Sequence, residues 1–564
     1  MSWNFFKNEK PLAIAGFALV FAVAIAWVFW GAWSPDFSIV SPDDPEGFEL
    51  TFGQCLANLW NGFAADGRFY PTQPLWDGVI APLCYVRELR YASGILLAAI
   101  AVVWFLRGRG LSRPAACAGG LFLAFSGYWI TLFSAGHGGI FVWMSYGLFA
   151  FGLIDRAIAS GKLRYWLLLG VTEGWATYRQ VDLWLLFAFF AGLWYLFCAF
   201  RKGFSKQLVI GTIAAAITFA LVGAPGIRDA FGSALTSRDQ QIKEGQTIST
   251  AKIGEVDEAE KRWIFCTNWS LPPAEVAEFF IPRLNGDTSC PLTLSIGSAR
   301  GTGVKPYTGA IGRPIDAKEG NYRQHSIYLG WVTCLFALFA LLSPTPTPHS
   351  HSSPTPTPTS HSHLSPDVLF FAGAAIFFCL CSFGRYFEPL YRVIFALPFG
   401  DYLRAPVKWH HLTEFSVAVL AGFGVEAALK RFGSRKAVFA AILALVVFGI
   451  GDLAYHAHFY CAAIDIREAR KTHSVRQTTV LRREDFSRPE VKQMVRDKRI
   501  ISQAYYLGNP GLYLVDILKP SKPAAPKFNS PVAVPFALGI LSWLAALAAI
   551  GYAVVERRKE RSAG

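Results

Sequence analysis

Long apolar runs, separated by short polar clusters, dominate the pattern of this chain. Most of them have roughly 17–23 residues, which is enough for a helix to cross a bilayer core of about 30 Å. The pattern predicts an all-α polytopic membrane protein with about 12 transmembrane helices. The expected spans are 11–33, 91–106, 114–134, 139–155, 164–180, 182–200, 207–224, 327–343, 367–383, 412–429, 437–454 and 532–555.

Composition agrees with this pattern. Of the 564 residues, 53% are hydrophobic and only 16% are charged, against about 25% charged in ordinary soluble proteins. The net charge of +14 could indicate a nucleic-acid partner. However, much of the Lys and Arg lies in short clusters at the ends of apolar runs, a pattern that reports membrane orientation. We therefore expect membrane lipids, and no nucleic acid, as partners.

Basic clusters also predict the topology. With twelve spans, the clusters fall on one side, which the positive-inside rule assigns to the cytoplasm together with both termini. Removing any one internal span would put basic loops on both sides. Residues 11–33 are expected to be an uncleaved first helix, because the run is long and no A-x-A-like site follows. These clusters are 107–113, 155–164, 201–206, 430–436 and 556–561.

Three parts follow from this topology: a transmembrane core (1–454), a basic extracytoplasmic segment (455–531), and a last helix with a cytoplasmic tail (532–564). The core carries long outer loops at 34–90, 225–326 and 384–411, and a Pro/Thr/Ser/His stretch at 343–367. That stretch is expected to be a disordered cytoplasmic linker, because it lacks apolar residues to bury. The basic segment either binds an anionic polymer or folds as a small docking domain.

Three carboxylates, Asp36, Asp43 and Asp44, lie in "SPDFSIVSPDD" directly after the first span. The aromatic loop 58–78, with Tyr70 and Trp76, follows them and is suited to stacking or to a membrane interface. A carboxylate here could take a proton from a hydroxyl or hold a divalent cation such as Mg²⁺ or Mn²⁺ through oxygen ligands. The alternative is that these acids only solvate a loop.

A basic counterpart, "LPFGDYLRAPVKWHH" (397–411), precedes the span at 412–429. Its donors suit a phosphate group, although snorkelling toward anionic head groups is the alternative. These donors are Arg404, Lys408, His410 and His411.

Two further residues, together with Tyr70 and Trp76 of the aromatic loop, are expected at a substrate cavity. His137 lies between glycines in the turn of a predicted helical hairpin. Glu173 lies within the span 164–180, where a charged carboxylate costs about 2.5–3.5 kcal/mol on insertion scales. We expect this carboxyl to be protonated, or paired with Arg179 or with another helix.

Several stretches together resemble YfhO-type membrane proteins of the GT-C polytopic glycosyltransferase class. They are "AFSGYWITLFSAGHGGIFVWMSYGLFAFGLIDRAI" (124–158), "NWSLPPAEVAEFFIPRLNG" (268–286), "YLGW" (328–331) and "LPFGDYLRAPVKWHHLTEFSVAVLAGFGVEAAL" (397–429). The chain departs from the family pattern at Lys408, where a second Arg is common, and its outer portions are shorter. The replacement keeps the charge but weakens bidentate phosphate capture.

The resemblance implies a transferase with its active site outside the cytoplasm. Its donor would be a polyprenyl-phosphate sugar, and its acceptor a glycan, a lipid or a teichoic-acid-like polymer. Asp43 or Asp44 would be catalytic, and Arg404 would lie near the donor phosphate. Two other readings stay open: a transporter or lipid flippase, for which no half-to-half repeat is visible, and an envelope polymer ligase with a pyrophosphate-linked donor.

Overall fold

The computed structural model describes most of the membrane part and portions of the long connections. The described residues are 11–33, 37–39, 52–68, 88–135, 137, 140–178, 181–234, 236, 239–240, 257–286, 289–290, 307–311, 326–343, 364–398, 400–433, 435–459, 461, 463–465, 467, 474–497, 499–505, 512–520 and 525–563.

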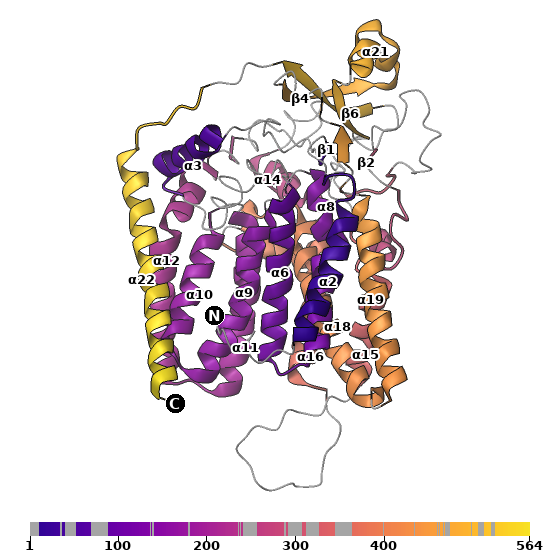
Figure 1. The fold of residues 1–564 in the computed structure, drawn as a ribbon. Coiled ribbons are helices and arrows are strands. Elements are labelled where there is room, and N and C mark those ends of the chain that lie inside the picture. The colour runs from indigo at the N-terminus through magenta and orange to yellow at the C-terminus, as the bar shows by residue number, and fades with distance from the viewer. Residues whose placement is uncertain are drawn as a thin grey trace.

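Each of the twelve predicted spans contains a helix, and most of these helices lie side by side along one direction (Figure 1). Their bounds are α2 Pro11–Val28, α6 Glu88–Gly108, α7 Arg113–Ala124 followed by α8 Gly127–Ala135, α9 Ile140–Ser160, α10 Leu163–Ala176, α11 Val181–Lys202, α12 Lys206–Asp229, α15 Trp331–Leu342, α16 Pro366–Ser382 followed by α17 Glu388–Ala396, α18 His410–Phe432, α19 Lys436–His458 and α22 Ala533–Ala563.

By length and composition, fewer than twelve of these helices can cross a membrane alone. Within the described ranges, seven are long and apolar enough, or up to nine if two bent pairs each form one span. The pair α7–α8 bends by 46° and the pair α16–α17 by 110°. Helices α2 and α15 are shorter apolar helices, and α10 has 14 residues. The protein is thus a multi-pass helical membrane protein, with fewer complete spans than the sequence pattern predicted.

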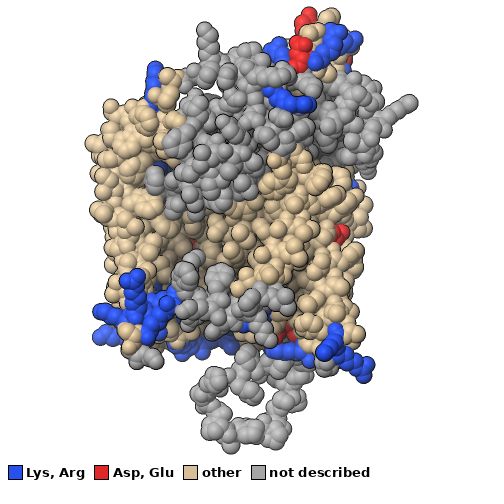
Figure 2. Space-filling model, in the orientation of Figure 1, with Lys and Arg blue, Asp and Glu red and all other residues tan. Residues whose placement is uncertain are grey.

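Lys and Arg gather along one end of the molecule, at the bottom of Figure 2. Buried and half-buried ion pairs connect the helices at this basic end, where α22 ends (Figure 1). The Arg109 guanidinium lies 3.6 Å from Asp155 on α9 and donates from Nε to Asp367 on α16 at 2.9 Å. Arg164 on α10 contacts Glu560 on α22 at 2.8 Å. Because Asp155 and Asp367 are largely buried, losing their cation would leave uncompensated charge.

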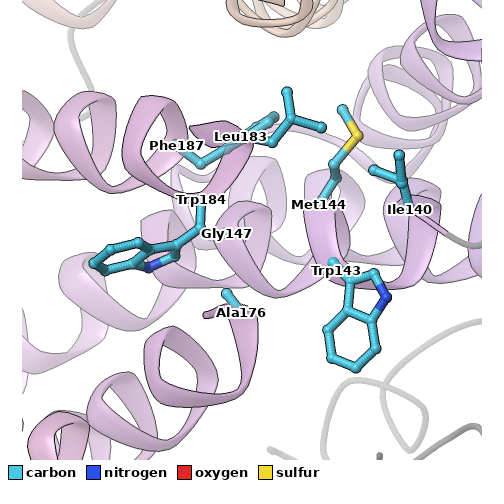
Figure 3. A pocket seen from close by; sticks show the side chains of 8 residues that line it. All are labelled: Ile140, Trp143, Met144, Gly147, Ala176, Leu183, Trp184 and Phe187. Atoms are coloured by element: carbon cyan, nitrogen blue, oxygen red, sulfur yellow. The ribbon is translucent and has the colours of Figure 1, made fainter. Parts of the chain in front are cut away.

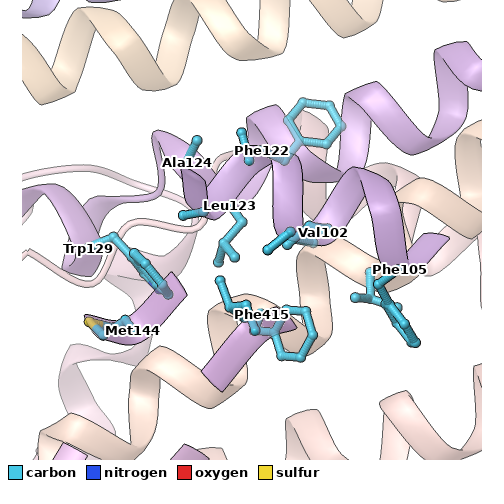
Figure 4. Packing of buried hydrophobic residues seen from close by; sticks show 14 of the residues in the cluster. Val102, Phe105, Phe122, Leu123, Ala124, Trp129, Met144 and Phe415 are labelled. Carbon is cyan, nitrogen blue, oxygen red and sulfur yellow. The ribbon is translucent and has the colours of Figure 1, made fainter. Parts of the chain in front are cut away.

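Aromatic packing fills the centre of the bundle (Figure 4). The ring of Phe415 on α18 contacts Phe151 on α9 and Phe190 on α11, with ring centroids 4.8 and 5.8 Å apart. Phe105 on α6 packs edge-on against Trp194 at 5.6 Å. One cluster of buried side chains therefore joins α6, α9, α11 and α18.

The end opposite the basic end, here called the loop end, carries α3 Phe52–Asp66, α14 Glu258–Thr267 and the strands (Figure 1). Strand β1 Phe37–Ile39 pairs with β3 Ala463–Asp465. An antiparallel sheet has the order β2-β5-β6-β4. Its strands are β2 Ser289–Cys290, β5 Ile500–Tyr505, β6 Leu512–Pro520 and β4 Ser474–Arg482.

This sheet was not predicted, so only the membrane part is all-helical as expected. Within 455–531, β4 and β6 pair over nine residues, from Ser474 opposite Pro520 to Arg482 opposite Leu512. The helix α21 Pro489–Arg496 places Val491 in a small buried cluster with Val515 and Ile517. A packed cluster of this kind is what the docking-domain reading of the basic segment requires.

Close helix packing makes Gly424 on α18 a sensitive position. A Cβ there would collide with the backbone carbonyl of Phe336 on α15, so we expect Gly424→Ala to destabilise the bundle by about 1–3 kcal/mol. Gly373→Ala on α16, where a Cβ would meet open space, is the matched control. Thermal unfolding in detergent measures both; equal melting temperatures for the two variants would contradict the observed approach of α15 and α18.

Candidate functional site

The basic stretch 397–411 is folded against the bundle at the loop end. It contains two short 3₁₀ turns, η5 Gly400–Tyr402 and η6 Pro406–Trp409, and leads directly into α18. Ala405 has φ of +61°, a left-handed conformation that is uncommon for a residue with a Cβ. The backbone N–H of Val407 donates to the carbonyl of Trp269 at 3.0 Å. The chain around Trp269 therefore supports the turn that presents Lys408.

An ion pair joins this stretch to the bundle. The Lys408 ammonium contacts the carboxylate of Asp182, the second residue of α11. The side chains are 18% and 5% exposed respectively, so the pair is mostly shielded from solvent. The other carboxylate oxygen of Asp182 accepts from the backbone N–H of Leu183 at 3.0 Å. Lys408 thus already has a carboxylate partner, and its charge is shared with Asp182.

Asp182 was not among the residues singled out from the sequence. The available signal was a lone carboxylate at the first position of the apolar run 182–200. An acid in the first turn of a helix is stabilised by the helix dipole, so that position alone did not indicate a second partner. The pairing with a residue 226 positions away becomes visible only in three dimensions.

Arg404 lies beside Lys408 and is half-buried. Its guanidinium is 4.8 Å from the ring centroids of both Phe265 and Trp269. A guanidinium held over two aromatic rings is stabilised by cation–π attraction and is pre-oriented with less loss of side-chain entropy. Of the four predicted phosphate ligands, Arg404 and Lys408 are the two that combine a fixed position with partial exposure.

His410 and His411 are instead buried in the core, with 0% and 1% exposure. The His410 ring stacks on Phe279 at 4.7 Å, and His411 lies 4.4 Å from Tyr128 between ring centroids. Nδ1 of His411 is 3.6 Å from the buried carboxyl of Glu414. The two imidazoles follow Lys408 in the chain and pack within the start of α18, an environment typical of a supporting role.

Outside the spans, the carboxyl group of Glu275 accepts two hydrogen bonds at the loop end. The hydroxyl of Tyr307 donates to one oxygen of Glu275, and the N–H of Ala310 to the other. Both side chains are buried. Burial, together with the adjacent carboxylate, raises the pKa of Tyr307 well above its usual range, so its hydroxyl stays a donor across physiological pH.

Of the four predicted cavity residues, the structure describes His137 and Glu173, which lie in different places. His137 lies between α8 and α9, where its backbone N–H donates to Leu132 at 2.8 Å. Glu173 lines a cavity of about 280 Å³ between α9, α10, α11 and α12. Its carboxyl accepts from the indole N–H of Trp184 on α11 at 2.9 Å. The expected partner on another helix is therefore Trp184.

A second, smaller pocket lies beside that cavity, between α9, α10 and α11 (Figure 3). Its volume is about 10 Å³, no more than a single water requires, so it cannot hold a sugar. Its lining residues are Ile140, Trp143, Met144, Gly147, Ala176, Leu183, Trp184 and Phe187.

The predicted acids Asp36, Asp43 and Asp44 lie outside the described residues, as do Tyr70, Trp76 and most of the linker 343–367. The distance from these acids to Arg404 and Lys408 is therefore not part of the described geometry. Among the residues that the structure describes, there is no group of three or more His, Cys, Asp or Glu placed to hold a metal ion. The Asp43 and Asp44 metal hypothesis stays a prediction.

Comparison with known proteins adds little to this description. No protein-family model matches the chain, and no curated protein matches it. Among solved structures, it is similar to an Archaeoglobus fulgidus oligosaccharyltransferase tethered to an acceptor peptide with the NVT sequon. The TM-score is 0.33 at 13% identity, over 96% of this chain and 63% of that one. A similarity this low leaves the function to be argued from the residues of the chain itself.

The Lys408–Asp182 pair makes a clear prediction for stability. Lys408→Met leaves a buried carboxylate without its cation and should destabilise the protein by about 3–5 kcal/mol. Adding Asp182→Asn in the same chain should restore most of that loss, because no isolated charge then stays buried. Melting temperatures of the two single variants and the double variant complete the cycle; additive losses would show that the pair is not coupled.

Proposed function

We propose that the protein is a membrane glycosyltransferase of the GT-C class, which moves a sugar from a polyprenyl-phosphate donor to a cell-envelope acceptor. The reaction would take place at the loop end, which the positive-inside rule puts outside the cytoplasm. The cytoplasmic membrane would hold the enzyme, with both termini inside. The acceptor class is a glycan, a lipid or a teichoic-acid-like polymer.

One observation carries this proposal. The four stretches that resemble the family are far apart in sequence, yet they contact one another at the loop end. The backbone N–H of Gly127 in the first stretch donates to the carbonyl of Tyr328 in the third at 2.8 Å. The backbone N–H of Leu329 in the third stretch donates to the carbonyl of Phe279 in the second at 3.1 Å. The N–H of Tyr128 donates to Glu414 at 2.8 Å.

The remaining contact joins the second and fourth stretches, where the backbone N–H of Val407 donates to the carbonyl of Trp269. Segments that resemble one family and also meet at one place are what a shared functional site requires. The meeting place includes Arg404 and Lys408, the residues proposed to hold the donor phosphate.

The proposed chemistry is a single displacement. Asp43 or Asp44 takes the proton of an acceptor hydroxyl, and the freed oxygen forms a bond with the anomeric carbon of the sugar. The bond between that carbon and the phosphate oxygen breaks, and its electron pair leaves with the polyprenyl phosphate. Attack opposite the leaving group inverts the anomeric centre.

Arg404 would stabilise the negative charge that grows on the departing phosphate, since preorganised cationic donors act most strongly where charge develops. Lys408 would add to the local positive potential, although Asp182 offsets part of its charge. A divalent cation held by Asp43 and Asp44 would supply further charge stabilisation if it binds there.

Removing the proposed base should slow transfer without unfolding the protein. Substitution of Asp43, Asp44 and Asp36 singly by Asn should give at least one variant with an activity about 10²–10⁴-fold lower, measured with a polyprenyl-phosphate sugar in detergent. Asp497→Asn, on an exposed residue that follows α21, is the control. Full activity in all three variants would rule out these carboxylates as the base.

Donor affinity tests Arg404 separately. Loss of a charge-assisted hydrogen bond of about 1.5–3 kcal/mol predicts donor binding about 10–100-fold weaker in Arg404→Ala, and a smaller loss in Arg404→Lys. Arg392→Ala is the matched control, because Arg392 also lies over an indole ring, that of Trp263 at 4.0 Å, but is 53% exposed on α17. Unchanged affinity in Arg404→Ala would remove this residue from the phosphate site.

A further inference from the structure

The cavity next to Glu173 is a groove between α11 and α12. Helix α11 packs mainly on α9, and α12 packs mainly on α10, so these two helices share few close contacts. Toward the loop end, the rings of Trp184 and Phe219 stack with centroids 5.5 Å apart. Toward the basic end, the hydroxyls of Tyr195 and Thr212 lie 2.9 Å apart. The groove lies between these two contacts.

Small residues create the space. Ala188 and Gly192 on α11 and Ala215 and Ala216 on α12 line the groove, and a Cβ built on Gly192 would meet no atom within 4 Å. From Trp184 to Tyr195 the groove follows α11 for about 16 Å, at 1.5 Å per residue. This length is about half of a hydrocarbon core of roughly 30 Å, which matches the depth of one leaflet.

The groove wall holds one carboxyl group. Trp184 donates its indole N–H to Oε2 of Glu173, whereas the buried Oε1 has no hydrogen-bond partner among the residues that the structure describes. A buried polar atom without a partner is costly, and it lies beside a space that is otherwise mostly apolar. A ligand hydroxyl would form a hydrogen bond with Oε1 whether the Glu173 carboxyl is protonated or ionised, because a hydroxyl both donates and accepts.

We propose that this groove binds a long-chain lipid alcohol from the membrane. Its hydrocarbon chain would lie between α11 and α12, and its hydroxyl would hydrogen-bond to Glu173 at the end nearest Trp184. The proposal does not depend on the glycosyltransferase assignment, because it rests only on the groove, its length and the unpartnered carboxyl oxygen.

The site is distinct from the proposed donor-phosphate site. Asp182, which pairs with Lys408, and Trp184, which lines the groove, are two residues apart on α11. Successive residues turn by about 100° around a helix, so these two side chains point to nearly opposite faces. A lipid with its phosphate at Arg404 and Lys408 would have to pass around α11 to place its chain in the groove.

Photolabelling of the full-length protein in detergent tests this site. A hexadecanol probe that carries a diazirine near the middle of its chain should label peptides within 184–195 and 212–219. Gly192→Leu fills the groove and should lower the labelling at least tenfold. Gly373→Leu, at a position on α16 where added atoms also meet open space, should leave the labelling unchanged. Melting temperatures verify that both variants are folded.

Two further comparisons test the ligand class. Glu173→Leu should lower labelling by the alcohol about tenfold but not labelling by the matched methyl ether, which lacks the donor. An excess of polyprenyl phosphate should not displace the probe. Equal labelling of the wild type and Gly192→Leu would overturn the groove as the site. Equal labelling by alcohol and ether in the wild type would overturn the role of Glu173, and displacement by polyprenyl phosphate would show that the two sites are one.

Discussion

The contact between Lys408 and Asp182 is the interaction on which the arrangement at the loop end depends. It connects the turn before α18 with the start of α11, two elements that otherwise share few contacts. Each charge is costly to bury alone and is tolerated because the other is present. Together with the backbone hydrogen bond from Val407 to Trp269, the pair holds the turn that also carries Arg404 over Phe265 and Trp269.

Helix α11 separates two different environments. One of its faces carries Asp182 toward Lys408 and the buried aromatic core. The other carries Trp184 and Gly192 toward a groove that opens between α11 and α12. Under the two proposals made above, the rim and the groove on opposite faces of this helix bind two different lipids.

The sequence predicted where the helices of the membrane part lie, because an apolar run long enough to span a bilayer has few other stable structures, but it overestimated the number of complete spans. It did not predict the bend between α7 and α8, where the Ser126 hydroxyl donates to Leu123 and Gly127 packs closely on Tyr328. The extramembrane sheet was also missed, since β2 and β5 come from segments more than 200 residues apart and neither strand is long. Both features depend on tertiary contacts that no local pattern encodes.

Among the site residues, the roles stay predictions, and the structure adds the surroundings of those it describes. Glu173 is an acid in an apolar run, and it lines a cavity. His410 and His411 looked like phosphate ligands because they follow Arg404 and Lys408, but the start of α18 turns both rings into the core. Asp182 was overlooked because an acid at a helix start is ordinary.

The donor-phosphate site is tested most directly by a structure determined in a lipid nanodisc with a bound polyprenyl-phosphate analogue. We expect phosphate density in hydrogen-bonding contact with the Arg404 guanidinium, at the loop end and on the Asp182 face of α11. Phosphate density in the groove beside Glu173, or at the basic end near Arg109, would contradict this site.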